Sequence, residues 1–227
     1  MHPPIFHTPT RLNVINAPIA KVKPRLRGWS HLISAVFAIP AAIILIMAAK
    51  NGLPTIGAIT YGVSLFLLLA TSGTYHTPYW SPSTRKKLQR VDRSMIFVLI
   101  AGSYTPFLLA TSGESLSLFI PVIWSIALLG IIRTLFLPHG QRWISTMSYI
   151  AMGWLAVPLF YQWMTQLGSN VVIPLCVGGV IYTLGAIAYA RKAPNPWPKT
   201  FGYHEIFHIA VILASICHYY AVWLVVV

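Results

Sequence analysis

The chain alternates between long apolar runs and short polar or basic segments. Seven runs approach the roughly 20 residues that a helix needs to cross about 30 Å of hydrocarbon. They lie near residues 29–49, 55–76, 92–111, 115–136, 143–163, 170–190 and 203–226. The pattern predicts an all-α integral membrane protein built as a bundle of seven transmembrane helices.

Several prolines lie inside these runs: Pro40, Pro106, Pro121, Pro158 and Pro174. Proline removes a backbone hydrogen bond, but neighbouring helices in a membrane can satisfy the freed groups. We therefore expect kinks at these positions rather than breaks.

Composition supports the membrane assignment. Apolar residues make up 56% of the 227 residues and charged residues only 8%, against about 25% charged in soluble domains. A chain with so few charged residues cannot form the polar, hydrated surface of a soluble protein. We expect a basic cytoplasmic N-terminal tail, residues 1–28, and one transmembrane domain, residues 29–227, with no separate soluble domain.

The net charge of +13 would suit a nucleic-acid partner, but the distribution of the basic residues along the chain indicates a membrane topology instead. With seven spans, 15 of the 16 lysines and arginines fall on the side that holds the N-terminus, and Lys50 alone falls on the other. Basic loops stay in the cytoplasm. The asymmetry predicts a cytoplasmic N-terminus and an outside C-terminus, in a multi-pass protein of the cell (inner or plasma) membrane that binds no nucleic acid.

Ionisable side chains of several spans meet at one depth in this topology. His204 and His208, four residues apart, share one face in the first turns of the last span. His76 ends the second span and Asp92 begins the third, both at the cytoplasmic boundary. An Asp at the membrane centre costs about 2.5 to 3.5 kcal/mol, so such groups normally face each other inside the bundle.

These residue types suit a metal site. His76, His204 and His208 form a three-nitrogen set for Zn²⁺ that leaves a fourth position for water, whose pKa zinc lowers toward about 7. Asp92 is placed to accept a proton or to orient the water. Ser72, one turn before His76, is placed to hold the water or a developing oxyanion.

Plainer interpretations compete with this one. The histidine pair could form hydrogen bonds between helices, and Asp92 could pair with Arg90 or Arg93. His31, at the start of the first span, could pack or cap rather than bind metal. His218 lies ten residues after His208, about 15 Å further along a helix, so we expect a core histidine there.

His204 to His208 also satisfies the pattern H-E-x-x-H, in which Glu205 would be the general base of a zinc protease. A third ligand would then be needed, and no Asp or Glu follows in the sequence. His76 is then the candidate third ligand. A ligand from the second span favours a different architecture from that of an intramembrane metalloprotease.

Three segments together carry a family resemblance: Ser72-Gly-Thr-Tyr-His76, Asp92 with residues 96–107, and Gly202-Tyr-His-Glu-Ile-Phe-His208. In order and spacing they resemble the hemolysin III family, the bacterial branch of the progestin and adipoQ receptor (PAQR) superfamily. The resemblance implies seven helices, an inside N-terminus, zinc on the three histidines, Ser72 and Asp92 in the polar site, and kinship with ceramidase-type lipid amide hydrolases.

One departure from the family pattern concerns the first span. Members usually carry an acidic residue seven positions before the histidine matched by His31, and an Asn four positions before it. Pro24 and Arg27 stand there in this chain. If those polar groups contact substrate, activity is altered or lost while the metal site survives.

Three classes of function follow from the sequence. The first is a zinc-dependent hydrolase of a membrane lipid amide or ester. The second is a lipid or membrane-state sensor with structural zinc. The third is a cytolytic protein, as the family name implies, although no charged stripe along a span suggests a conduit. A membrane lipid is the expected substrate or ligand in the first two.

Overall fold

The structure, a computed structural model, describes residues 23–112, 114–137 and 142–227. Most of the expected basic tail, residues 1–22, lies outside the described residues. The helices are Trp29–Ala48 (α2), Leu53–His76 (α3), Pro82–Leu109 (α4), Glu114–Phe136 (α5), Arg142–Trp154 (α6), Val157–Leu159 (η1, a 3-10 turn), Phe160–Gln166 (α7), Ser169–Arg191 (α8) and Tyr203–Val226 (α9). The described chain has no strand beyond one isolated bridge between Trp197 and Phe201, so the predicted all-α class is confirmed.

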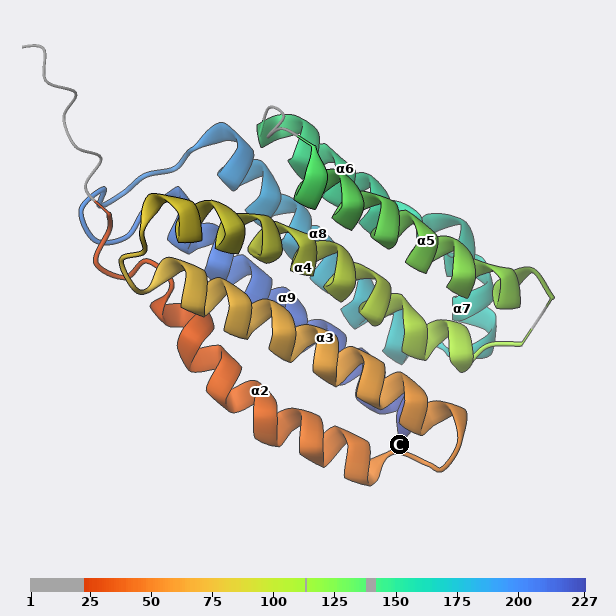
Figure 1. Ribbon diagram of the computed structural model, residues 1–227. Coiled ribbons are helices and arrows are strands. Elements are labelled where there is room, and N and C mark those ends of the chain that lie inside the picture. Colours follow the sequence, from red (N-terminus) through yellow and green to blue (C-terminus); the bar gives the residue numbers. More distant parts are fainter. Residues whose placement is uncertain (1–22, 113, 138–141) are drawn as a thin grey trace, which may run out of the picture.

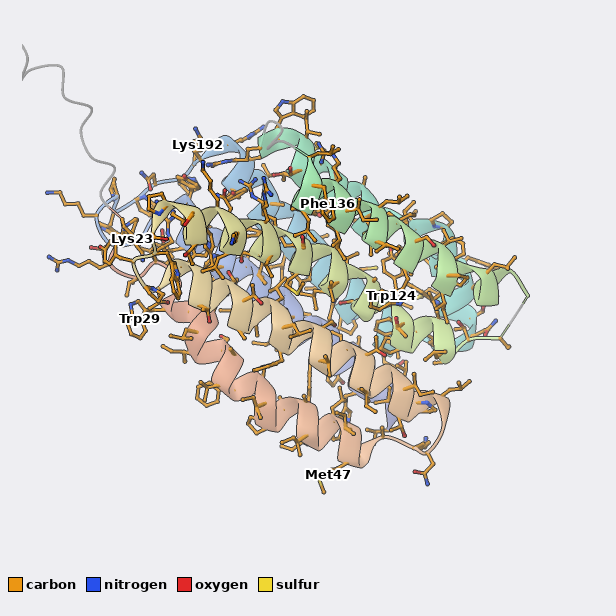
Figure 2. The ribbon with its side chains drawn as sticks, in the orientation of Figure 1. Lys23, Trp29, Met47, Trp124, Phe136 and Lys192 are labelled. Atoms are coloured by element: carbon orange, nitrogen blue, oxygen red, sulfur yellow. The ribbon has the colours of Figure 1, made fainter. Side chains whose placement is uncertain are left out.

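The helices lie side by side and run back and forth along one direction (Figure 1). Lys23, Trp29 and Lys192 lie at one end of the bundle, which we call the basic end, and Met47 lies at the opposite end (Figure 2). The last turn of α9 is also at that opposite end, where the Lys50 amide donates to the Val226 carbonyl at 2.8 Å. The start of α2 and the end of α9 therefore lie at opposite ends of the bundle.

Six helices of the described chain are long and apolar enough to cross a membrane: Trp29–Ala48, Leu53–His76, Leu118–Phe136, Arg142–Gln166, Ser169–Arg191 and Tyr203–Val226. Large apolar side chains point outward from them, with Phe37 69% and Met47 80% exposed. In water such exposure would be costly, whereas lipid accepts it. The protein is thus a multi-pass membrane protein, and the seventh predicted span, α4, stays a prediction.

Helix α4 begins at Pro82, well before the predicted start near residue 92. Ser81 caps it by accepting a hydrogen bond from the Thr84 amide at 3.3 Å, and proline suits the first helical position. The prediction was wrong here because it followed apolar residues alone. The first turns of α4 are basic and project beyond the apolar part of the bundle.

Pro158 interrupts its helix, so the kink predicted at this position was wrong. The chain passes from α6 into the 3-10 turn Val157–Leu159 and then into α7. A proline in a helix interior both removes one hydrogen bond and clashes with the preceding turn. Pro40, Pro106, Pro121 and Pro174 lie inside continuous helices, as expected.

Glycines let neighbouring helices approach closely around α3. A Cβ added to Gly73 would lie 2.7 Å from the Leu32 Cα of α2, and one added to Gly102 would lie 2.2 Å from the Ser64 hydroxyl. Small residues at such contacts are typical of membrane helix packing. They hold α3, which ends in His76, between α2 and α4.

Candidate metal centre

The three histidines predicted as ligands come together at the basic end of the bundle. His76 is the last residue of α3, and His204 and His208 lie in the first two turns of α9. Helix α9 begins after Gly202, whose amide donates to the Glu205 carboxylate at 2.8 Å. This cap fixes the start of the helix and with it the register that sets His204 and His208 on one face.

The geometry of the three imidazoles fits a metal ion. One nitrogen from each of His76, His204 and His208 lies within 4.8 Å of the others, and the Nε2 atoms of His76 and His204 are 3.1 Å apart. Two nitrogens bound tetrahedrally at about 2.0–2.1 Å would be about 3.3 Å apart. The donor set is one that zinc prefers, so the residues present fit the metal that the sequence predicts.

His31 packs against this cluster instead of joining it. Its ring stacks on His208 at 3.8 Å between centroids with an interplanar angle of 6°, and its Nε2 donates to the His208 carbonyl oxygen at 3.2 Å. The expectation that His31 packs or caps is confirmed. Buried His208 Nδ1 has no hydrogen-bond partner in the described structure, as is also true of the Nδ1 atoms of His31 and His218.

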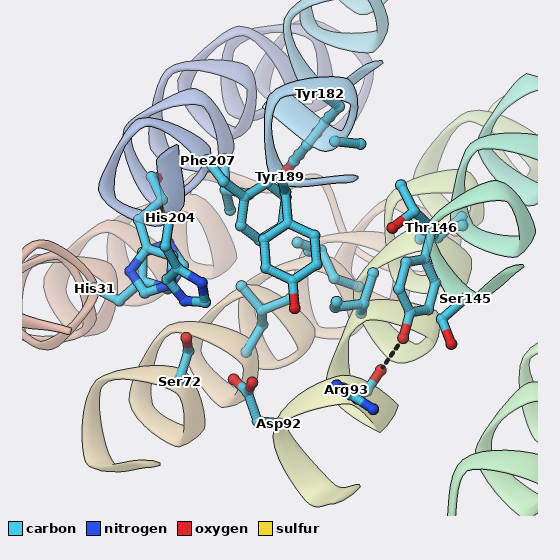
Figure 3. A pocket seen from close by; sticks show the side chains of 18 of the residues that line it. His31, Ser72, Asp92, Arg93, Ser145, Thr146, Tyr182, Tyr189, His204 and Phe207 are labelled. Atoms are coloured by element: carbon cyan, nitrogen blue, oxygen red, sulfur yellow. Dashed lines mark hydrogen bonds between the residues drawn. The ribbon is translucent and has the colours of Figure 1, made fainter. Parts of the chain in front are cut away.

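Asp92 and Ser72 face the histidines from α4 and α3 (Figure 3). An Asp92 carboxylate oxygen lies 3.8 Å from His76 Nε2, and Ser72 lines the same cavity beside it. Arg90 donates instead to the Leu135 carbonyl oxygen at 2.9 Å. Within the described residues, Asp92 makes no ion pair with Arg90 or Arg93, so the competing ion-pair interpretation is not supported.

Glu205 is engaged in a contact that sequence analysis missed. Its carboxylate accepts from the Arg27 guanidinium as well as from the Gly202 amide, and the residue is only 3% exposed. A carboxylate committed to a cap and an ion pair is poorly placed to act as the general base of a protease. The sequence did contain one sign of this contact: Glu205 lies in the first turn of an apolar span, and an acid buried there requires a cation nearby.

His218 lies outside the cluster, as expected. Its Nε2 donates to the Leu175 carbonyl oxygen at 3.2 Å, and its ring meets the ring of Tyr182 edge-on at 5.3 Å. It is therefore a hydrogen-bonded histidine of the bundle core.

A cavity of about 1270 Å³ runs from the basic end of the bundle, where Lys23 and Lys199 line it, past the histidines and into the bundle. The lining near the basic end is polar and includes Ser72, Asp92 and Arg93. Deeper in the bundle the lining side chains are larger and less polar, and they include Ile100, Phe107 and Trp163. A cavity that is polar at one end and mainly apolar at the other suits an amphiphilic ligand.

The fold and the site together define a helical multi-pass membrane protein with a candidate three-histidine metal site at the polar end of an internal cavity. Residues 19–219 match the family described as Haemolysin-III related. The chain belongs to this family.

Individual relatives place the chain in a wider group. It is 36% identical over 200 residues to Hemolysin-3 of Bacillus cereus, covering 85% of this chain and 87% of the relative. It is 27% identical to the human monocyte to macrophage differentiation factor, covering 86% of this chain and 81% of that protein. The Drosophila melanogaster adiponectin receptor protein is 25% identical, with 86% of this chain and 48% of the receptor covered. These relatives support the superfamily that the motifs predict.

Proposed function

We propose that His76, His204 and His208 hold a zinc ion and that the protein is a zinc-dependent hydrolase of a membrane lipid amide or ester. The observation that carries the proposal is the position of the histidines. They lie where the polar end of a 1270 Å³ cavity meets its apolar part. An amphiphile in this cavity would have its amide or ester bond near the histidines and its chain among the apolar side chains.

Each polar residue has a task in this reaction. Zinc, when bound, supplies a Lewis acid and activates water at neutral pH. Asp92, 3.8 Å from His76, accepts a proton during attack and returns it to the leaving group. Ser72, which lines the cavity beside Asp92, holds the water or the developing oxyanion. His31 stacks on His208 and fixes the orientation of its ring.

The proposal includes a membrane orientation. We place α4 across the membrane as the seventh span, with the basic end in the cytoplasm and the end of α9 outside. The support is the charge asymmetry, because cytoplasmic loops are enriched in lysine and arginine. The histidines then open toward the cytoplasmic leaflet of the cell membrane.

A lipid or membrane-state sensor with structural zinc is the second candidate. Arg27, where family members carry Asn, is bound to Glu205 beside the ligand His204. This contact braces the site and takes Arg27 away from substrate. The cytolytic alternative has only names in its favour, those of the matched family and of the Bacillus relatives.

The enzyme hypothesis is tested at Asp92. Asp92→Asn preserves the shape of the side chain and removes the proton acceptor, so zinc should stay bound while turnover falls by about 10² to 10⁴, the usual contribution of a positioned general base. The measurement is zinc-dependent hydrolysis of short-chain ceramides and related lipid amides and esters in micelles, at equal zinc occupancy.

Glu205→Gln is the matched control. Its amide oxygen can still accept from the Gly202 amide and from Arg27, although the ion pair is lost and stability falls. Compared at equal zinc occupancy, it should keep most of the turnover, whereas the protease hypothesis predicts that it loses turnover. Wild-type protein that hydrolyses none of these lipids would favour the sensor. A fully active Asp92→Asn protein would reject the role assigned to Asp92.

A further inference from the structure

The cavity lining on α4 changes from charged to apolar along one helix face. Lining side chains recur every three or four positions from Arg85 to Phe107, and the change falls between Arg93 and Ile96. At 1.5 Å per residue this stripe is about 33 Å long. The basic end of the cavity is thus suited to the polar head group of an amphiphile.

Cations from four separate parts of the chain converge on this end of the cavity. They come from the segment before α2, from α4, from α6 and from the α8–α9 connection: Lys23, Arg85, Arg93, Arg142, Lys192 and Lys199. Asp92 is the one carboxylate among the lining residues of the described chain. Glu205, the other buried acid nearby, already binds Arg27. The cavity end therefore carries a large uncompensated positive charge.

Two of these cations are held in place by the fold. The Lys23 ammonium donates to the Thr77 and Pro78 carbonyl oxygens at 2.8 and 3.1 Å. The Arg142 guanidinium lies 4.6 Å from the centre of the Tyr189 ring. Burial lowers the pKa of Lys23, and the positive charges of Arg27 and Arg85 lower it further. These charges repel one another, so an anion between them would be stabilised.

The general excess of basic residues on cytoplasmic loops does not explain this placement. Lys87 and Arg191 belong to the same basic end and are exposed, as Arg85 and Lys192 are, yet they do not line the cavity. Loop charge alone would give Lys87 the same effect on a ligand as Arg85, and Arg191 the same effect as Lys192. Comparing Arg85 with Lys87, and Lys192 with Arg191, therefore distinguishes an anion site in the cavity from a generally basic surface.

We propose that the basic end of the cavity binds a phosphate group, so that the preferred lipid is an anionic amphiphile with a phosphate-bearing head. This deepens the proposed function and rests on it, because it names the class of substrate. Guanidinium groups match phosphate oxygens in pairs, and cations from several directions can surround a doubly charged group. Free phosphate shares this chemistry and is the alternative source.

The test is calorimetric binding to the purified full-length, zinc-loaded protein in a neutral detergent. The probes are dihexanoyl phosphatidic acid, the matching dihexanoylglycerol without phosphate, and inorganic phosphate. Phosphatidic acid should bind about tenfold or more tightly than dihexanoylglycerol. Arg85→Ala and Lys192→Ala should each weaken its binding about tenfold, which is the expected loss for one hydrogen bond to a charged group. Lys87→Ala and Arg191→Ala should leave binding unchanged.

The outcomes separate the sources and the hypotheses. Equal binding of dihexanoylglycerol, or equal losses in Lys87→Ala and Arg191→Ala, would overturn the proposal. If inorganic phosphate binds as tightly as phosphatidic acid, with the same effects of the variants, the ligand is free phosphate and the assignment to a lipid head group is wrong. The metal-site variant His204→Ala should keep the preference for phosphatidic acid. If that preference holds in protein that hydrolyses no lipid, the headgroup site stands and the hydrolase proposal falls.

Discussion

Arg27 and Glu205 form the ion pair that most affects the environment of the histidines at the residue scale. Glu205 is nearly fully buried, with its side chain 4% exposed, and the Arg27 side chain is 19% exposed. Removing the cation leaves a buried carboxylate with the Gly202 amide as its remaining described partner. Arg27 is therefore expected to stabilise the start of α9 and the placement of His204.

Arg27→Ala should lower the free energy of unfolding by about 2 kcal/mol, the usual value for a hydrogen bond to a charged group. Thermal unfolding of the detergent-solubilised protein measures it. Arg25→Ala is the control, because Arg25 is exposed and its side chain has no described contact. Unchanged stability in Arg27→Ala would mean that solvent or another cation replaces the pair.

Sequence alone located much of the candidate site at this scale. His204 and His208 follow from helical spacing, His76 follows from the depth at which α3 ends, and Asp92 follows from the depth at which the apolar part of α4 begins. The contact between Arg27 and Glu205 joins residues 178 positions apart, and no local pattern indicates it. Arg27 could be recognised as a departure from the family pattern, but its partner Glu205 could be identified only from the fold.

At the scale of helices, the close approach of α3 to α2 positions the end of α3. A Cβ at Gly73 would lie 2.7 Å from the Leu32 Cα and 2.8 Å from its amide nitrogen. These are backbone atoms, so relief requires the two helices to separate. Gly73 lies one turn before His76, and any separation would displace that ligand.

Gly73→Ala should therefore cost about 1–3 kcal/mol of stability, as overpacking does, and should lower the zinc content. Gly179→Ala in α8 is the matched control, because a Cβ there meets no atom within 4 Å and alanine is the better helix former. Thermal unfolding and elemental analysis are compared for both variants. Equal behaviour of the two would show that the α2–α3 contact does not position His76.

Apolar runs predicted α9 at residues 203–226, where the structure has it, because apolar residues extend to both ends of that helix. They missed the start of α4, because hydropathy does not register charged turns beyond the apolar region. Ser81 followed by Pro82 is a helix-start pattern that could have corrected the boundary. The break at Pro158 could not be predicted, since the other prolines inside the predicted spans, Pro40, Pro106, Pro121 and Pro174, lie within continuous helices.

For the whole molecule, the charge asymmetry between the two ends predicts its orientation in the membrane. The basic end holds the cations of the first turns of α4 and of the α8–α9 connection, and Lys50 lies near the last turn of α9. Reporter domains fused after Val227 and inserted next to Lys87 should be active on opposite sides, with the Lys87 insertion in the cytoplasm. Activity of both on one side would contradict seven spans.

The central claim is that three histidines, from the end of α3 and the start of α9, hold one zinc ion. Elemental analysis of the purified protein and its variants tests it most directly. We expect about one zinc per chain in wild type, most of it lost in His76→Ala, His204→Ala and His208→Ala, and full retention in His218→Ala, whose ring lies outside the cluster. Full zinc retention in His76→Ala, or no zinc in folded wild type, would contradict it.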